Sequence, residues 1–304
     1  MLLLQIATAG IATGSVYALI AIGIVLIYKC SGVVNFGQGG YVMLGAYAAY
    51  ALTRLGLSPQ LAAAGAVLIL AAVGALTELL VLRRMLKAPV VAVMMVTLGL
   101  LILFRAVCLA IFGPDQIAFP QIFPQGAVDI AGIFITYNYV AAAVLSLVLS
   151  LAFLAFYRYT PMGLMQRAAA DNSRAALAVG IHVSNQVSVA WAVSSALAGL
   201  GGVLLATLNS LSLTLSSIGL VAFPVIVLGG LTSLMGSLVA GLLLGMLEAF
   251  TDGLLTPALE SFLRAHTSVY SVGALQQVVP YMLVGAMLLV RPQGIFGQRG
   301  TERV

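Results

Sequence analysis

Residues 1–28 read MLLLQIATAGIATGSVYALIAIGIVLIY, and none of them carries a charge. About 20 apolar residues let a helix cross the hydrocarbon core of a bilayer, so this stretch is long enough to span one. A signal peptide would begin with basic residues, and none precedes this apolar run. We therefore interpret residues 6–28 as a membrane helix that ends at Lys29.

The composition of the whole chain supports the same interpretation. Of its 304 residues, 62% are hydrophobic and only 7% are charged, whereas a soluble domain carries about 25% charged residues. So few charges cannot cover a surface that faces water, and they also exclude a disordered chain, a coiled coil and a disulfide-based scaffold. The two cysteines, Cys30 and Cys108, lie in separate apolar stretches, where free cysteine packs as a small apolar residue. The sequence predicts an all-α, polytopic membrane protein, with residues 1–304 forming a single membrane domain.

Charged residues divide this domain into about eight membrane segments. Residues 175–247 carry no charge, and as one helix they would reach about 110 Å, far more than the ~30 Å core of a bilayer. The chain must therefore fold back there, and Pro224 with Gly229-Gly230 marks residues 220–230 as a half-helix that enters and turns. The predicted segments are 6–28, 30–53, 60–82, 90–112, 138–157, 183–208, a re-entrant half-helix pair within 220–250 (220–230 and 236–250), and 275–290. Residues 113–137 are predicted to be an external loop.

The basic residues orient the chain relative to the membrane. If the segments alternate, Arg54 and Arg264 fall on one side and Arg105 falls within a span. The other ten bases share the opposite side: Lys29, Arg83, Arg84, Lys87, Arg158, Arg167, Arg174, Arg291, Arg299 and Arg303. Because cytoplasmic loops carry the excess of basic residues, that side is predicted to be cytoplasmic, with the C-terminus. This bias accounts for the net charge of +5, so no nucleic-acid partner is needed.

The sequence lacks the motifs of the common catalytic sites. A phosphate-binding loop needs Gly-x-x-x-x-Gly-Lys-Ser/Thr, but the two lysines are followed by Cys30 and Ala88. The two histidines, His182 and His266, are too far apart for a His-Glu-x-x-His motif, and no Gly-x-Ser-x-Gly occurs. We expect no enzyme activity, no metal site and no cofactor in this chain.

A polar segment, RYTPMGLMQRAAADNSRAALAVGIH at residues 158–182, connects two spans. Thr160 can cap a helix whose first position is Pro161, alanines favour its continuation, and Gly180 is suited to end it. The pattern predicts a cytoplasmic helix over residues 161–179 that is too polar to span. An ordinary amphipathic helix at the membrane interface fits the same pattern.

Two glycine-rich stretches predict breaks in membrane helices. The first, NFGQGG at residues 35–40, places three glycines and two amides early in the second segment, and the second is formed by Pro224 and Gly229-Gly230. Broken helices persist in a membrane where they face protein or a wet cavity, and in a transporter-like chain they indicate the translocation path. The predicted path residues are Asn35, Phe36, Gly37, Gln38, Gly39, Pro224, Gly229 and Gly230. Close helix packing is the alternative, and it is our interpretation of Gly10-x-x-x-Gly14 and Gly241-x-x-x-Gly245.

Four motifs, in order along the chain, resemble those of one permease family. Within residues 158–182, the pattern Met162-Gly163, Arg167-Ala168, Asp171, Ala175-Ala176 and Gly180-Ile181 resembles the cytoplasmic coupling loop of ABC importer permeases. More closely, residues 35–47, 222–245 and 291–297 resemble the LivH-type permeases of branched-chain amino-acid ABC transporters. The resemblance covers nearly the whole chain. It implies that the residues that couple to an ATPase are Gly163, Arg167, Ala168, Asp171 and Gly180.

The same resemblance implies partners, a location and a function. The partners are a second homologous permease, two cytoplasmic ATPase subunits that bind ATP and Mg²⁺, and an extracytoplasmic solute-binding protein. The location is a bacterial inner membrane, and the function is the permease subunit of an ATP-driven importer for branched-chain or related small amino acids. Family members commonly have His and Glu where this chain has Gln38 and Gly40, so urea, short amides or other amino acids remain open as cargo. The alternative is a stand-alone channel or an ion-coupled carrier for a small polar solute.

Overall fold

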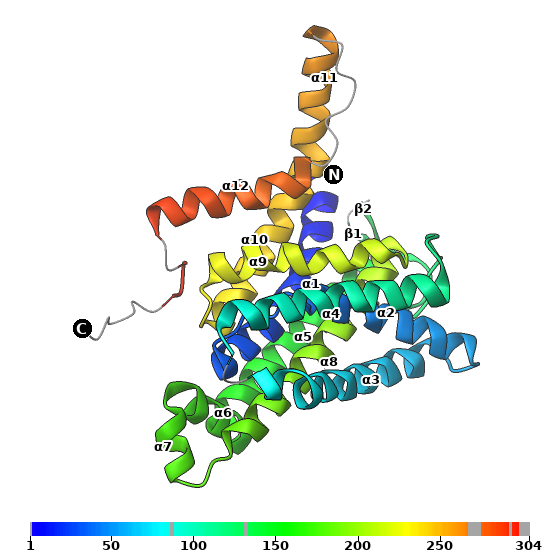
Figure 1. Cartoon of the computed structure of the whole chain (residues 1–304). Helices are drawn as coiled ribbons and strands as arrows, with labels where there is room; N and C mark the ends of the chain where they lie inside the picture. The colour runs from blue at the N-terminus through cyan, green and yellow to red at the C-terminus, as the bar shows by residue number, and fades with distance from the viewer. Residues whose placement is uncertain (1, 86–87, 131–132, 267–274, 292–293, 298–304) are drawn as a thin grey trace.

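The computed structural model describes residues 2–85, 88–130, 133–266, 275–291 and 294–297, most of them in helices (Figure 1). The α-helices are α1 Leu2–Ser31, α2 Gln38–Arg54, α3 Pro59–Leu80, α4 Val90–Phe112, α5 Tyr137–Tyr159, α6 Pro161–Asp171, α7 Ser173–Ala178, α8 Val183–Asn209, α9 Ile218–Gly229, α10 Leu234–Phe250, α11 Thr256–His266 and α12 Leu275–Val290. Short turns of other helix types are η1 Leu82–Met85, η2 Leu213–Ser217 and the π-turn η3 Thr251–Leu255. The predicted all-α membrane fold is confirmed.

Six helices of the described part are long and apolar enough to cross a membrane. They are α1, α3 with η1, α4, α5, α8, and the run Leu234–His266 that joins α10 to α11. The remaining predicted segments correspond to shorter helices, with 17 residues in α2, 12 in α9 and 16 in α12. The predicted count of eight therefore stays a prediction.

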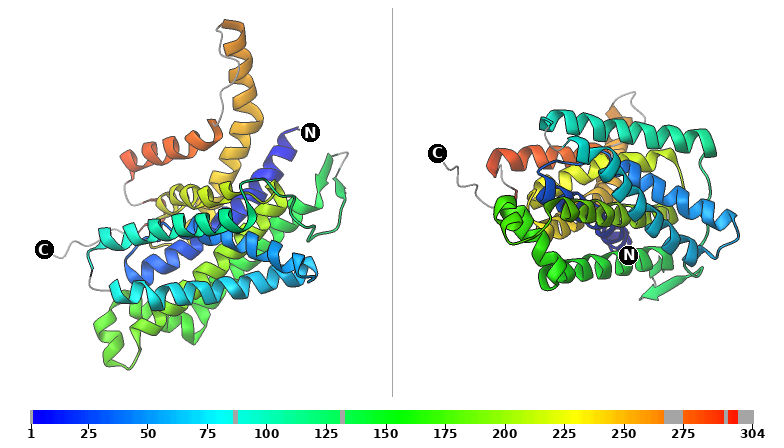
Figure 2. Two further views of the ribbon diagram at one scale, coloured as in Figure 1. Left: turned by 45° about the vertical axis from the view of Figure 1, so that its right-hand side comes forward. Right: turned by 60° about the horizontal axis from the view of Figure 1, so that its bottom comes forward.

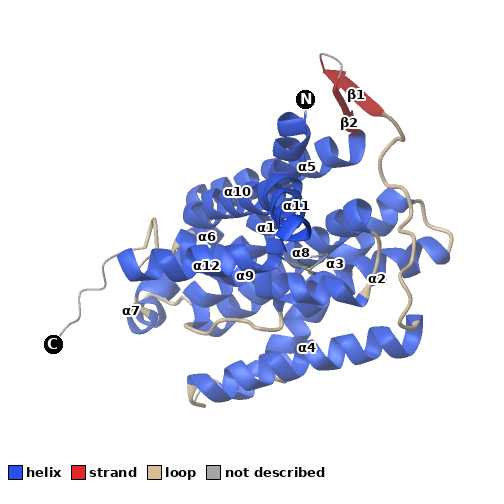
Figure 3. Ribbon diagram, turned by 90° about the horizontal axis from the view of Figure 1, so that it is seen from above, coloured by secondary structure: helices blue, strands red, loops and turns tan. Residues whose placement is uncertain are grey.

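Helix α1 forms the centre of the bundle, and α4 lies along its outer edge (Figure 3). In α1, 89% of the most apolar window is buried, against 11% in α4. Small residues let α10 approach α1 closely, because a Cβ on Gly14 would lie 2.7 Å from the carbonyl oxygen of Gly241 and one on Gly245 would overlap Gly14. The interpretation of these two glycine pairs as packing motifs is confirmed.

The two predicted arms within 220–250 correspond to α9 and α10, and the second arm, 236–250, agrees with α10 Leu234–Phe250. The helical run does not stop there, because the π-turn joins α10 to α11, so that Leu234–His266 spans 33 residues. The charges after residue 250 suggested an end to the segment, yet charges do not stop a helix as a backbone break does. Figure 2 shows α11 standing away from the bundle, and no residue of this helix is buried.

The two ends of the bundle carry different structures. Helices α6 and α7 lie at one end, and an antiparallel hairpin of β1 Ala127–Ile130 and β2 Ile133–Thr136 lies at the other (Figure 1). The hairpin falls within the predicted external loop, and its four-residue strands are too short for alternation to be recognised in the sequence.

The single helix predicted over 161–179 is wrong, because the chain breaks at Asn172. There φ is −152°, and the side-chain oxygen of Asn172 accepts hydrogen bonds from the backbone N–H groups of Arg174 and Ala175. Asparagine competes well as an N-cap residue, and here that preference divides one helix into two.

Candidate functional site

The first glycine-rich stretch lies mostly outside the helix that it was predicted to break. Helix α1 ends at Ser31 and α2 begins only at Gln38, so residues 35–37 belong to the connection between them. Gln38 and Gly39 form the first turn of α2. The stretch therefore allows a tight entry into α2 and does not interrupt it, since glycine tolerates close approach of another backbone.

The two amides of this stretch form a buried hydrogen-bond network. Asn35 and Gln38 are fully buried, and the Asn35 side-chain nitrogen donates to Oε1 of Gln38 at 3.0 Å. The Gln38 side-chain nitrogen donates to the backbone oxygen of Ser194 at 3.3 Å and to its hydroxyl at 3.2 Å. Ser194 lies in α8 and is also fully buried. Both predicted path amides are thus bonded inside the protein, which fixes the start of α2 against α8.

Phe36 connects this stretch to the second predicted break. Its ring stacks on Phe223 of α9 with centroids 4.6 Å apart and planes 24° from parallel. Its backbone N–H donates to the hydroxyl of Thr97 in α4 at 3.2 Å. At the second residue of α2, a Cβ on Gly39 would overlap the carbonyl oxygen of Ser216 and lie 2.9 Å from the backbone nitrogen of Gly219, so η2 and α9 pack directly against the start of α2. The structure therefore brings the two predicted path stretches together.

The second stretch, predicted to break at Pro224 and Gly229-Gly230, breaks at its glycines. Helix α9 ends at Gly229, and the turn is made by Gly230, whose φ is +95°. The helix continues through the buried Pro224, because packing against neighbouring helices permits proline inside a membrane helix, so the prediction is wrong for Pro224 alone. A Cβ on Gly229 would lie 2.5 Å from the carbonyl of Gly236 at the start of α10.

Residues 294–297 pack on this turn. The backbone N–H of Ile295 donates to the carbonyl of Leu228 at 2.8 Å, and a Cβ on Gly230 would lie 2.7 Å from the backbone nitrogen of Gly297. Two motifs that are far apart in the sequence, at 222–245 and 291–297, are therefore neighbours in space. Arg299 and Arg303 of the predicted cytoplasmic bases, and Lys87, lie outside the described residues.

Two of the predicted coupling residues are held by the chain itself. Gly163 is buried, and a Cβ there would overlap the carbonyl of Tyr157 at the end of α5. One guanidinium nitrogen of Arg167 donates to the backbone oxygens of Tyr157 at 2.8 Å and Arg158 at 2.9 Å. The hydroxyl of Thr160 accepts from the backbone N–H of Gly163 at 3.2 Å, as predicted for a capping residue. These contacts fix α6 to the end of α5.

The other predicted coupling residues are more open. Ala168 is half-buried, and Asp171 and Gly180 are exposed. Gly180 has a φ of +86°, which is the left-handed conformation expected of a glycine at a helix end. Among the described residues, no three His, Cys, Asp or Glu side chains are placed to hold a metal ion.

Residues that the sequence did not single out complete this arrangement. Ser194 and Thr97 supply the hydrogen bonds that hold the first stretch, and Phe223 supplies the stacking partner. Of these three residues, only Phe223 lies in a stretch that the sequence motifs indicate, residues 222–245. The serine and threonine could not be told apart from the others on their helices, because their role depends on which helix faces them.

Similarity to known proteins extends over almost the whole chain. Residues 6–290 match the family model described as the permease component of branched-chain amino acid transport systems. The chain is 30% identical to a high-affinity branched-chain amino acid transport system permease protein, LivH, of Salmonella typhimurium, over 97% of this chain and 96% of the relative. It is 28% identical to the permease protein BraD of Pseudomonas aeruginosa, with 99% and 98% covered, and 29% identical to a probable LivH of Methanocaldococcus jannaschii, with 92% and 88% covered. No solved structure matches the chain significantly. With its polytopic helical fold and its family match from α1 to α12, the chain belongs to the permease components of branched-chain amino acid transport systems.

Proposed function

We propose that this chain is the membrane-spanning permease subunit of an ABC importer for branched-chain or related small amino acids. The observation that carries the proposal is the family match over residues 6–290, together with relatives named as branched-chain amino acid permeases at about full length. The importer would hold a second homologous permease, two cytoplasmic ATPase subunits and an extracytoplasmic solute-binding protein.

The energy source lies on other subunits in this proposal. No Gly-x-x-x-x-Gly-Lys-Ser/Thr sequence exists in the chain, so it cannot form a phosphate-binding loop of that type. ATP and Mg²⁺ would bind to the ATPase subunits, and this chain would hydrolyse no ATP by itself. The free energy of ATP hydrolysis must then be transmitted to the permease through a contact with the ATPase subunits.

Helices α6 and α7 are suited to make that contact. Leu164 of α6, Leu177 of α7 and Val179, directly after α7, are 59%, 58% and 76% exposed. Large apolar side chains that are exposed on a polar connecting segment favour burial in a groove of a partner. Gly163 and Arg167 would act indirectly, by holding α6 on α5, while Ala168, Asp171 and Gly180 lie at or near the open surface.

The orientation follows from the basic residues. The end of the bundle with α6 and α7 carries Arg158, Arg167 and Arg174, so the proposal places that end and the C-terminus in the cytoplasm of a bacterial inner membrane. The hairpin end would then face the solute-binding protein.

The test is uptake of labelled L-leucine by cells that express the chain with its cognate ATPases, second permease and binding protein. We expect uptake to need ATPase subunits with intact ATP sites. Leu164→Asp should lower uptake and ATPase co-purification about tenfold, since loss of one buried docking contact costs 1–2 kcal/mol or more. Leu55→Asp is the control, because Leu55 is 77% exposed at the far end of α2. Solute flux through the purified chain alone would contradict the proposal and favour a channel or ion-coupled carrier.

A further inference from the structure

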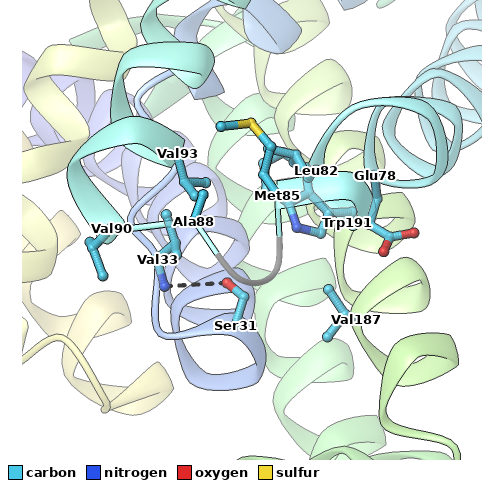
Figure 4. Close-up of a pocket in the computed structure, with 10 residues that line it drawn as sticks. All are labelled: Ser31, Val33, Glu78, Leu82, Met85, Ala88, Val90, Val93, Val187 and Trp191. Atoms are coloured by element: carbon cyan, nitrogen blue, oxygen red, sulfur yellow. Dashed lines mark hydrogen bonds between the residues drawn. The ribbon is translucent and has the colours of Figure 1, made fainter.

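A cavity of about 140 Å³ lies between the ends of α1 and α3, the start of α4 and the first turns of α8 (Figure 4). It contains none of the predicted path or coupling residues. Its walls are mostly apolar side chains: Leu82, Met85, Val90, Val93 and Val187. A cavity of about 150 Å³ in an apolar core can hold benzene, so this one is large enough for a branched aliphatic side chain.

One wall of the cavity carries a buried carboxylate with unused hydrogen-bonding capacity. Glu78 is 1% exposed, and its two oxygens accept from the guanidinium of Arg83 at 3.3 and 3.2 Å. The hydroxyl of Ser188 also donates to Oε2. A carboxylate offers about four acceptor positions, so one position on Oε1 remains free. Arg83 balances the charge of Glu78.

Hydrogen-bond donors face the same cavity. Trp191 is 2% exposed, and within the described part of the chain its indole N–H has no hydrogen-bond partner, although Figure 4 places the indole nitrogen among the lining side chains. An acceptor on a ligand in the cavity would supply the partner that this donor lacks. The cavity also adjoins the start of α4, where the first helical hydrogen bond is donated by Ala92 to Pro89. The amides before Ala92 have no partner within the helix, and a helix N-terminus favours a negative group.

We infer that this cavity binds a zwitterionic amino acid, which has no net charge, with a branched aliphatic side chain. The ammonium group would donate to Glu78, the carboxylate would accept from Trp191 and the first turn of α4, and the side chain would fill the apolar walls. A cationic or anionic side chain, as in lysine or glutamate, would be buried against the apolar walls, which is costly. Urea would leave the apolar walls unfilled. This inference rests on the proposed function for the class of cargo, and adds a binding site near the α6 end of the bundle.

Trp191 makes the test direct, because it is the only tryptophan of the chain. Tryptophan fluorescence of the full chain, purified in detergent, should change saturably with L-leucine and should not change with urea or L-lysine. Isoamylamine, which lacks the carboxylate, and 4-methylpentanoate, which lacks the ammonium group, should each bind at least tenfold more weakly than L-leucine. Saturable fluorescence changes with urea of the same size as with L-leucine would overturn the inference.

Two matched variants locate the binding. Val93→Phe fills the cavity and should abolish the L-leucine response, whereas Val107→Phe makes the same change on the same helix where the side chain is 41% exposed, and should preserve it. Trp191→Phe removes the indole donor and should weaken L-leucine binding in equilibrium dialysis about five- to tenfold, the effect of one lost hydrogen bond. Unchanged binding in both Val93→Phe and Trp191→Phe would place the ligand elsewhere and overturn the inference.

The outcome can be separated from that of the proposed function. ATP-dependent leucine uptake by the complete importer, with no saturable binding by the purified chain, would contradict the cavity site and support the proposed function. Binding that is lost in Val93→Phe, without any leucine uptake by the importer, would support the cavity site and contradict the proposed function.

Discussion

The rings of Phe36 and Phe223 stack with centroids 4.6 Å apart, which joins the connection before α2 to the middle of α9. The two residues come from the two stretches that the sequence indicates as breaks along a translocation path. Offset aromatic pairs contribute about 0.5–1.5 kcal/mol beyond their buried area. That is enough to favour the closed contact, and small enough for the two segments to separate during transport.

Linking these two positions should stop transport. In a chain without its free cysteines, Cys30 and Cys108, Phe36→Cys with Phe223→Cys should react with a short bifunctional thiol reagent. We expect leucine uptake to fall at least tenfold and to recover when a reducible linker is cleaved. The control pair joins Phe36→Cys to Leu220→Cys, since Leu220 is 48% exposed and makes no such stack. Full uptake by a quantitatively linked chain would show that the stack does not open.

The packing of α1 on α10 should not tolerate a side chain at Gly245. A Cβ there would overlap backbone atoms of Gly14 and lie 2.6 Å from the carbonyl of Gly10, so Gly245→Ala should lower the unfolding temperature and the yield of folded protein. Gly99→Ala is the matched control, because a Cβ at Gly99 meets nothing within 4 Å. That change should stabilise α4 by up to about 1 kcal/mol through helix propensity. Thermal unfolding in detergent measures both, and equal stability of the two variants would contradict the packing argument.

Loss of the Gln38 amide should destabilise the chain. Gln38→Leu removes the acceptor of Asn35 and the donor to Ser194, both fully buried. Each buried polar group left unpaired costs about 1–3 kcal/mol. Gln60→Leu is the control, since the bond from Gln60 to the carbonyl of Ile122 is exposed to solvent. The measurement is the free energy of unfolding in denaturant, and a Gln38 variant no less stable than the Gln60 variant would mean that the network adds nothing.

The proposed orientation can be tested at Ser173, which is exposed at the start of α7. In the cysteine-free chain, Ser173→Cys should react with a membrane-impermeant maleimide only in inside-out vesicles. Asp115→Cys, exposed in the loop after α4, should react only from the outside of intact cells. Labelling of Ser173→Cys in intact cells would show that the whole chain has the opposite orientation.

Much of the local structure could be predicted from the sequence. The apolar runs predict helices whose bounds agree with α1, α3, α4, α5 and α8 within a few residues, because a membrane forces every backbone polar group to be bonded inside its own helix. Thr160 and Gly180 bound the α6–α7 segment as predicted, since capping depends on one or two residues and not on distant contacts.

Predictions failed where a local preference competes with another. Asn172 was predicted to lie within a helix but caps a new one, and Pro224 was predicted to break the chain with Gly229-Gly230 but lies within α9, which ends only at the glycines. Both residues permit either outcome, and the energies that separate the outcomes are a few kcal/mol at most. The contacts made by the rest of the chain decide between them.

The sequence by itself determined the membrane class, the helices and the small residues that let them pack. Only the tertiary structure decided which polar groups meet: Gln38 with Ser194, Glu78 with Arg83 and Ser188, and the indole of Trp191 with a cavity. The reason is physical. Helix formation in a membrane depends on hydrogen bonds and apolar surface within one segment, whereas a buried polar site depends on the rotation and depth of several helices at once. Those are set by close packing over the whole bundle, which no single stretch of sequence encodes.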